Sequence, residues 1–351
     1  MDTTIQPVKL TQYSRGGGCG CKIAPAVLQD ILTALPAKKP AAELLVGFDT
    51  ADDAAVWDLG NGTAIINTVD FFTPIVDDPY NFGRVAATNA LSDVYAMGGK
   101  PLFANSVLGW PVDRLSPELA GLVLKGASAV CEEAGITIAG GHSIDSAEPF
   151  FGLSVNGIVN TSNIKKNSSA KAGDLLFLTK PLGAGVLASA AKKGLLNEEQ
   201  EQRWIAEMCK RNSIGSLLGE HSWVHSMTDV TGFGLLGHLL EMAKGSRLSA
   251  ELYFDKIPVL EDAKIFIPQF VFPDNVYRNW NACEKEVEGV SGTSFIVLCD
   301  PQTSGGLLIS VSPDKIEDLK SILIENQYAE EFLQPIGRFL AVGDKSIKVI
   351  E

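Results

Sequence analysis

The order of apolar and polar positions divides the chain into alternating strand-like and helix-like segments. In the first half, apolar residues at helical spacing predict helices. Short apolar or alternating runs between them predict strands. The predicted helices cover residues 25–35, 81–97 and 117–134. The predicted strands are two within 44–57 and one each over 64–72, 102–108, 136–143 and 151–159.

The second half follows the same plan after a polar stretch over residues 162–169. Strands are predicted over 175–179, 295–299, 307–311, 336–339 and 347–350. Helices are predicted to begin within 181–188 and to cover 235–243 and 315–327. A chain of 351 residues is too long for one ordinary core. We therefore predict an α/β (α+β) protein with an N-terminal segment over 1–48 and two α/β domains over 49–160 and 171–351.

Composition narrows the class of partner. The formal net charge of −13 argues against a broad surface for nucleic acid or anionic membranes, which attract basic proteins. No run of about 18 apolar residues suggests a membrane span, and residues 1–4 do not resemble a signal peptide. The 6 cysteines form no CxxC pair, as is typical of reduced thiols. We expect a soluble, cytoplasmic protein.

Residues 14–22, here called the glycine arm, read SRGGGCGCK. The glycines give the backbone unusual conformational freedom, yet the segment carries Cys19, Cys21 and Lys22. A nearby cation lowers the pKa of a thiol, and the thiolate is the nucleophile. The arm is therefore a candidate lid that brings a reactive thiol and an ammonium to a bound substrate. The alternative is a flexible tail with incidental cysteines.

Aspartates recur at predicted loops and element ends: Asp53, Asp70 and Asp229. Asp93 instead falls four positions after Asn89 on the apolar stripe of a predicted helix, where a carboxylate needs a partner. No cluster of histidines or cysteines accompanies them. Oxygen ligands suit Mg²⁺, which bridges carboxylates to phosphates. These residues predict Mg²⁺-dependent phosphate chemistry with a reactive thiol.

Several glycine motifs are candidates for nucleotide sites. GAGVLA at 183–188 and GFGLLG at 232–237 match dinucleotide-binding patterns, but neither is followed by the strand and acidic residue that such sites require. The loop predicted around Gly140, Gly141 and Ser143 could hold a phosphate or be a plain turn, and His142 alone is more often structural. The segment 226–234 is either an anion or metal site at a helix N-terminus or a set of helix caps.

Seven motifs taken together resemble the selenophosphate synthetases over nearly the whole chain. In order, they read GGGCGCK, DDAAV, TVDFF, NALSDVYAMGGKP, AGGHSID, TDVTGFGLLGH and DPQTSGGLL. The wider superfamily, which includes aminoimidazole ribonucleotide synthetase and thiamine-monophosphate kinase, shares the acidic motifs. The arm with its cysteine and lysine distinguishes the selenophosphate branch. The resemblance implies a two-domain fold of the aminoimidazole ribonucleotide synthetase type, an N-terminal sheet that pairs in a homodimer, and a C-terminal α/β sandwich.

The same resemblance implies the reaction of ATP, selenide and water to selenophosphate, AMP and orthophosphate. Cys19 and Lys22 match catalytic positions, and Cys21 matches a less critical cysteine. Asp53, Asp93 and Asp229 match metal ligands. The implied contacts to ATP are Lys22, Thr50, Ala51, Asp52, Asp70, Asp93, Gly141, His142 and Ser143. Mg²⁺ is the implied cofactor, K⁺ is a further candidate, and a selenium-delivery protein is a candidate transient partner.

Two other functions stay open at this point. One is another ATP-dependent enzyme of the superfamily that acts on a ribonucleotide or thiamine phosphate, against which the glycine arm argues. The other is a non-catalytic protein that binds selenium or a metal through Cys19 and Cys21, which would leave the acidic motifs without a role.

Overall fold

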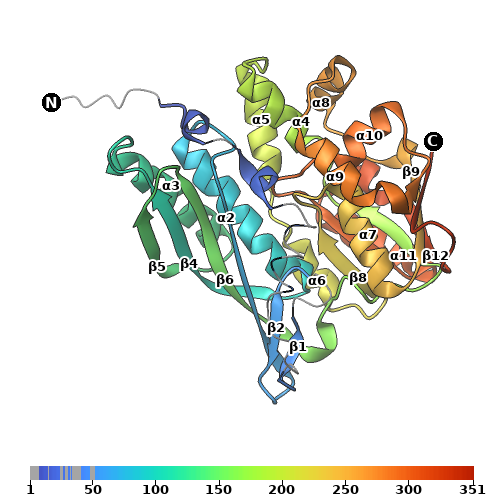
Figure 1. Cartoon of the computed structure of the whole chain (residues 1–351). Coiled ribbons are helices and arrows are strands. Elements are labelled where there is room, and N and C mark those ends of the chain that lie inside the picture. Colours follow the sequence, from blue (N-terminus) through green and yellow to red (C-terminus); the bar gives the residue numbers. More distant parts are fainter. Residues whose placement is uncertain are drawn as a thin grey trace.

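The chain folds into two α/β domains, each built on one mixed β-sheet (Figure 1). The structure, a computed structural model, describes residues 8–14, 16–23, 27, 31, 33, 41–47 and 52–351. The helix predicted over 25–35 lies largely outside the described residues. The α/β class predicted from the hydrophobic pattern is confirmed.

The N-terminal domain contains a six-stranded sheet in the order β1-β2-β3-β6-β4-β5. Its strands are β1 (Leu44–Val46), β2 (Ala55–Asp58), β3 (Thr63–Phe72), β4 (Lys100–Trp110), β5 (Ile138–Asp145) and β6 (Phe150–Asn160). Only the β4–β5 pair is parallel; the other pairs are antiparallel. Alternating side chains of β3 point to opposite faces, so Ala64 and Ile66 are buried whereas Val69 and Phe71 are exposed.

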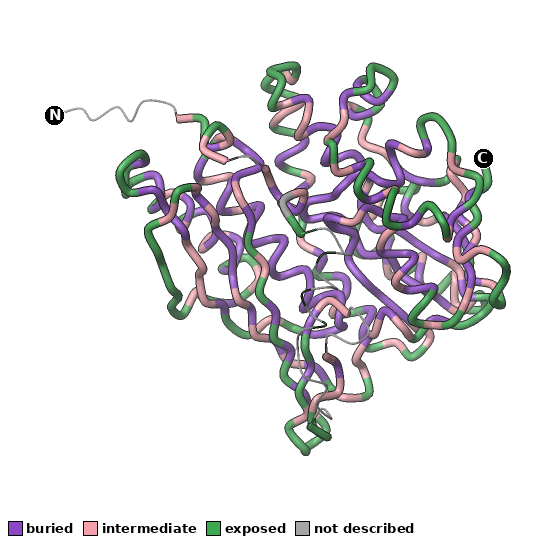
Figure 2. Tube along the Cα trace, in the orientation of Figure 1, coloured by how far each residue is buried: buried purple, intermediate pink, exposed green. Residues whose placement is uncertain are grey.

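The buried face of this sheet is covered by α2 (Pro79–Ala96) and α3 (Pro117–Glu133). Helix α2 begins after Asp78, whose side chain accepts a hydrogen bond from the Asn81 amide at 2.8 Å. Nearly every residue of α2 is buried, because the helix packs on sheet strands and also on α6 (Ile214–Gly219) and β8 (Val224–Asp229) of the second domain. Figures 1 and 2 show α2 as a buried rod between the two sheets.

The C-terminal domain contains a seven-stranded sheet in the order β10-β13-β9-β12-β7-β11-β8. The remaining strands are β7 (Leu175–Leu178), β9 (Ser249–Tyr253), β10 (Val287–Glu288), β11 (Leu307–Val311), β12 (Gly337–Leu340) and β13 (Ile347–Ile350). The remaining helices are α4 (Ala184–Lys192), α5 (Glu198–Met208), α7 (Gly234–Ser246), α8 (Glu261–Phe266), α9 (Asn275–Cys283), α10 (Gly292–Cys299) and α11 (Ile316–Glu325).

Both faces of this second sheet are covered. All five residues of β11 are buried. Leu308 packs in the core that contains Leu239 of α7, whereas Leu307 and Ile309 pack in a separate cluster with Leu319 of α11. A strand buried on both sides reads as a continuous apolar run, which is how β11 appears in the sequence.

The structure corrects several local predictions. Residues 295–299, predicted as a strand, belong to helix α10, which begins with a reciprocal capping box between Ser291 and Ser294. Gly140 and Gly141, expected in a loop, lie inside the continuous strand β5. The pattern analysis also missed the helices α5, α6, α8 and α9 and the strands β8, β9 and β10. Within the described residues, no helix combines the length and the apolar character needed to cross a membrane.

Candidate active site

Residues 16–22 of the glycine arm are docked between the two domains. Gly18 has a φ of +57°, and a Cβ atom there would lie 2.3 Å from Oγ1 of Thr303; glycine permits both the conformation and the close approach. The Gly18 amide donates to the carbonyl of Thr73 at 2.9 Å, and the Cys19 amide donates to Thr303 Oγ1 at 3.0 Å. The arm therefore bridges a loop of the first domain and a loop of the second.

The second domain also contacts the backbone of the arm at Gly20 and at the Cys19 carbonyl. The Asn275 side chain donates to the carbonyl of Gly20 at 2.7 Å. A Cβ on Gly232 would lie 2.6 Å from the carbonyl oxygen of Cys19, so Gly232 allows the arm to approach the segment that follows β8. These contacts leave Cys19 only 1% exposed. We call this packed arrangement of residues 16–22 the closed position of the arm; its role as a lid stays a prediction.

The Cys19 thiol is connected to Asp70 through hydrogen bonds of the Asn89 side chain. Its Sγ atom donates to Oδ1 of Asn89 at 3.2 Å. The same Oδ1 accepts the amide of Ser304 at 2.8 Å, and Nδ2 of Asn89 donates to Asp70. Because Asp70 needs a donor and Ser304 needs an acceptor, the amide of Asn89 has one allowed orientation. Asn89 therefore fixes where the thiol lies.

Lys22 forms an ion pair with Asp70. Its Nζ atom is 3.7 Å from Oδ1 of Asp70, and its side chain is 37% exposed. The negative charge of Asp70 is the main cause that raises the pKa of Lys22, with Cys19, Asp93 and Asp229 adding to it against the effect of burial. The ammonium therefore stays charged at physiological pH.

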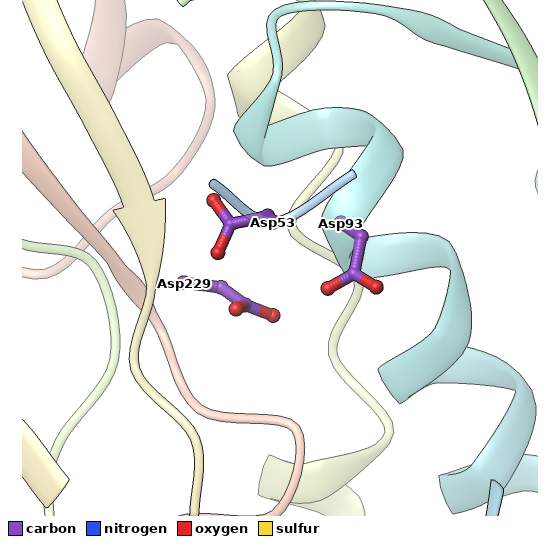
Figure 3. Close-up of side chains that lie close together, drawn as sticks. All are labelled: Asp53, Asp93 and Asp229. Carbon is purple, nitrogen blue, oxygen red and sulfur yellow. The ribbon is translucent and has the colours of Figure 1, made fainter. Parts of the chain in front are cut away.

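Asp53, Asp93 and Asp229 converge from three separate elements, as Figure 3 shows. Asp53 precedes β2, Asp93 lies in α2, and Asp229 is the last residue of β8. One carboxylate oxygen from each lies within 4.8 Å of the others. We call these three residues the aspartate cluster. Asp93 is 9% exposed and Asp229 is 2% exposed, so the cluster is largely shielded from water.

Hydrogen bonds satisfy part of the aspartate cluster. Thr228 donates to Oδ1 of Asp53 at 2.8 Å, and Thr68 donates to Oδ2 of Asp93. Oδ2 of Asp53 and Oδ2 of Asp229 are buried with no hydrogen-bond partner among the described residues. Buried, partnerless carboxylate oxygens are costly unless a cation or a proton reaches them.

The pKa of each carboxyl in the cluster is raised, first by burial and then by neighbouring negative charge. The charge of Asp229 adds to the rise for Asp53 and Asp93. A divalent cation would relieve both effects, because it favours the ionised form and supplies the missing partner. The donor set, all oxygen, fits Mg²⁺.

The strand pairing of the second domain places Asp229. Leu307 of β11 is paired with Asp229 of β8, and the Val230 amide donates to the carbonyl of Gly306 at 2.8 Å. Helix α7 begins only at Gly234 and shows no side-chain cap. The alternative that Thr228, Asp229 and Thr231 cap this helix is therefore wrong; Asp229 belongs to the cluster instead.

The other residues expected at the nucleotide are dispersed or undescribed. Thr50 and Ala51 lie outside the described residues. Oδ1 of Asp52 accepts the backbone amide of Asn167 at 2.8 Å. Gly141, His142 and Ser143 are exposed on β5, the edge strand of the first sheet, and no described contact joins them to the aspartate cluster. Their role at the nucleotide stays a prediction.

Sequence reasoning missed the part that the loop over residues 301–306 plays. Thr303 and Ser304 of this 301–306 loop reach Cys19 and Asn89, and Thr303 also lines a cavity of about 730 Å³ beside the arm. Gly17, Gly20 and Arg278 line the same cavity, whereas the aspartate cluster does not. Its volume is in the range of small-molecule sites. The motif DPQTSGGLL marked the loop, but nothing in the motif indicated its contacts.

Two family models together match most of the chain. The model described as AIR synthase related protein, N-terminal domain, matches residues 51–159, and the corresponding C-terminal domain model matches residues 171–350. The chain is 54% identical to the selenide, water dikinase of Photorhabdus laumondii over 90% of this chain and 91% of the relative. It is 51% identical to that of Pasteurella multocida, with 97% and 96% covered.

Solved structures of much lower identity share the fold. The tt0281 protein of Thermus thermophilus gives a TM-score of 0.69 at 18% identity, with 93% of this chain and 96% of that chain covered. AaThiL, solved with AMPPCP and TMP, gives 0.67 at 17% identity, with 92% of each chain covered. The hydrogenase maturation protein HypE, solved in complex with ATP, gives 0.63 at 17% identity, with 97% and 94% covered.

Proposed function

The chain belongs to the selenide, water dikinase family, and on this premise we propose that it converts ATP, selenide and water to selenophosphate, AMP and orthophosphate. Product selenophosphate would supply activated selenium for selenocysteine and selenonucleoside synthesis. Two phosphoanhydride bonds of ATP must break in this reaction. Selenium takes the terminal phosphoryl group, and water takes the second as orthophosphate.

The observation that carries the proposal is the buried aspartate cluster beside a docked, thiol-bearing arm. Asp53, Asp93 and Asp229 would hold Mg²⁺ through the oxygen atoms that converge in Figure 3. When bound, the ion neutralises phosphate charge and bridges phosphates to the protein. Two proteins of this fold were solved with AMPPCP or ATP bound, which supports a nucleotide site here. K⁺ is proposed as a second cation.

Each remaining site residue has a distinct proposed task. Lys22, kept protonated by Asp70, would pair with phosphate oxygens of ATP. Thr50, Ala51, Asp52, Asp70, Asp93, Gly141, His142 and Ser143 complete the proposed nucleotide contacts. Cys19 would guide selenide to the terminal phosphorus, and the closed arm would keep water from that phosphorus until selenium is present. Burial of Cys19 supports such shielding.

A homodimer fits the exposed apolar face of the N-terminal sheet. Val69 is 55% exposed, Phe71 48% and Ile144 50%, all outside the face that α2 and α3 cover. Apolar patches of this kind mark association surfaces. We further propose a cytoplasmic location, since none of the five cysteines with described side chains forms a disulfide. A selenium-delivery protein is proposed as a transient partner.

The test is anaerobic incubation with ATP, Mg²⁺ and selenide, followed by phosphorus NMR. Wild type should give a selenium-bonded phosphorus signal together with AMP, and Cys19→Ala should give neither. Cys131→Ala is the matched control, because Cys131 is also buried but lies in α3, away from the arm. Conversion of ATP to ADP regardless of selenide would refute the proposal and favour a kinase of the same superfamily.

A further inference from the structure

Lys180 is a buried ammonium outside the set of residues considered so far. It follows β7, is only 4% exposed, and forms no ion pair within the described part of the chain. Its Nζ atom donates to the carbonyl of Ser304 at 2.8 Å and to the carbonyl of Lys210. Burial lowers the pKa of Lys180 to about 8. A lysine held at such a cost needs a structural or functional reason.

The carbonyl that Lys180 binds belongs to a strained residue. Ser304 has a φ of +53°, in the left-handed region that glycine favours, and is 2% exposed. A non-glycine residue keeps this conformation only when its surroundings hold it there. Three contacts do so: the Lys180 ammonium on the Ser304 carbonyl, Asn89 on the Ser304 amide at 2.8 Å, and Asn212 on the next carbonyl, Gly305, at 2.8 Å.

The conformation of Ser304 determines how the 301–306 loop meets the arm. Thr303 accepts the Cys19 amide, and one residue later Ser304 donates to the Asn89 oxygen that also accepts the Cys19 thiol. Both contacts to Cys19 therefore depend on two adjacent residues of one loop. Lys180 donates hydrogen bonds both to this loop, at the Ser304 carbonyl, and to the carbonyl of Lys210, which follows α5. It therefore connects the loop to the end of that helix.

We propose that Lys180 is a positioning residue that holds the 301–306 loop so that Thr303 and Asn89 can bind Cys19 and keep the glycine arm closed. The effect on turnover rests on the proposed function, whereas the effect on arm closure does not. Lys180 touches neither the aspartate cluster nor the arm in the described contacts. Its influence passes through Ser304, and its loss would release the thiol rather than remove a reacting group.

The test compares Lys180→Met with Lys165→Met. Lys165 is a matched control: it is 5% exposed, burial lowers its pKa to about 8, and it donates to one backbone carbonyl, that of His221, at 2.8 Å. The readout is the rate at which iodoacetamide alkylates Cys19 in substrate-free protein, followed by peptide mass spectrometry. Thermal unfolding reports whether the two variants lose similar stability.

In Lys180→Met, iodoacetamide should alkylate Cys19 at least about tenfold faster than in wild type. This is the factor expected from losing one charge-assisted hydrogen bond. In Lys165→Met, iodoacetamide should alkylate Cys19 at the wild-type rate. Equal rates in wild type and Lys180→Met, or equal acceleration in both variants, would overturn the proposal. If Lys180→Met does not fold, Lys180→Arg takes its place, because arginine keeps the charge but moves the hydrogen-bond donors. A wild-type rate of Cys19 alkylation in Lys180→Arg would then overturn the proposal.

The same proteins separate this inference from the proposed function. In the selenide assay, Lys180→Met should lower kcat about tenfold while KM for ATP changes less than about twofold, because the loop acts on Cys19 and not on the aspartate cluster. A lowered affinity for ATP with unchanged kcat would contradict positioning of the thiol. Faster alkylation without selenide-dependent product in any protein, wild type included, would refute the function and leave the role of Lys180 intact.

Discussion

The thiol of Cys19 donates to the side-chain carbonyl of Asn89 at 3.2 Å, across a separation of 70 positions in the sequence. Asn89 is completely buried, and its other contacts, to Ser304 and Asp70, determine which way its amide points. One side chain in α2 therefore joins the arm, the second domain and the partner of Lys22.

Replacing Asn89 with alanine should destabilise the protein by about 2 to 4 kcal/mol, because it leaves the buried amide of Ser304 without its acceptor and removes one hydrogen-bond donor from Asp70, which keeps its ion pair with Lys22. Urea unfolding measures this loss. Thr88→Ala is the control: Thr88 is equally buried on the same helix but bonds only to the carbonyl of Arg84, so about 1 kcal/mol is expected. Equal losses in the two variants would contradict the connecting role of Asn89.

Asp93→Asn should stabilise the metal-free protein near pH 7.5 and weaken Mg²⁺ binding. Asp93 has a raised pKa in the folded state, mainly through burial and then through Asp229. The folded state therefore holds the proton more tightly than the unfolded state. The stability that this carboxyl contributes is complete below pH of about 4, the ordinary pKa of aspartate, and is lost as pH rises through the raised value.

Thermal unfolding between pH 4 and 8 without metal checks this pH dependence. Wild type should lose more stability over the interval than Asp93→Asn, and Mg²⁺ should restore wild type only. Asp344→Asn, a substitution at an exposed turn, should behave as wild type. A wild-type pH slope in Asp93→Asn would show that the cluster is not under electrostatic strain.

Lys22→Met should lower ATP turnover about a hundredfold or more, since it removes the ammonium assigned to phosphate oxygens. Its effect on stability should stay within about 1 kcal/mol, because the pair with Asp70 is partly exposed. Lys100→Met is matched to it, since Lys100 also forms an exposed ion pair, with Glu220 at 3.4 Å. Steady-state kinetics and urea unfolding measure the two effects, and a loss of turnover shared by Lys100→Met would speak against a specific role.

Val69→Glu combined with Phe71→Glu should convert a dimer into a monomer in sedimentation velocity. The two side chains lie on the same exposed face of β3, and glutamates there would oppose burial against a second copy. Val342→Glu places a single glutamate on the other domain, where Val342 is 75% exposed, and should leave the dimer intact. A wild-type protein that sediments as a monomer at micromolar concentration would remove the basis of this prediction.

Local patterns predicted helix α2 and strand β11, in which nearly every position is buried, but misassigned residues 295–299. Helix α2 was expected from its apolar stripe, and the four-residue spacing of Asn89 and Asp93 correctly placed both side chains on one face. Residues 295–299 are apolar and almost all buried, so spacing cannot distinguish a strand from a helix there. The pair Ser291 and Ser294, which caps the helix, was the available sign.

The site itself depends on contacts that spacing cannot reveal. Thr228 and Asp53 are bonded although 175 positions separate them. Without the family resemblance, the aspartates could be identified as chemically suited to a metal, but not as neighbours. Loop contacts such as those of Thr303 and Ser304 depend on strand pairing between β8 and β11, which the sequence alone does not specify.

The hydrogen bond between the Cys19 amide and Thr303 spans 284 positions, which has a consequence for the nascent chain during synthesis. A ribosome releases the glycine arm early, long before the 301–306 loop emerges. Domains fold as they are synthesised, N-terminal first, so the first domain can form before the 301–306 loop that contacts Cys19 has been made. During that interval Cys19 faces cellular oxidants and electrophiles unprotected. Completion of the C-terminal domain is therefore also the step at which the protein acquires chemical protection for its own nucleophile.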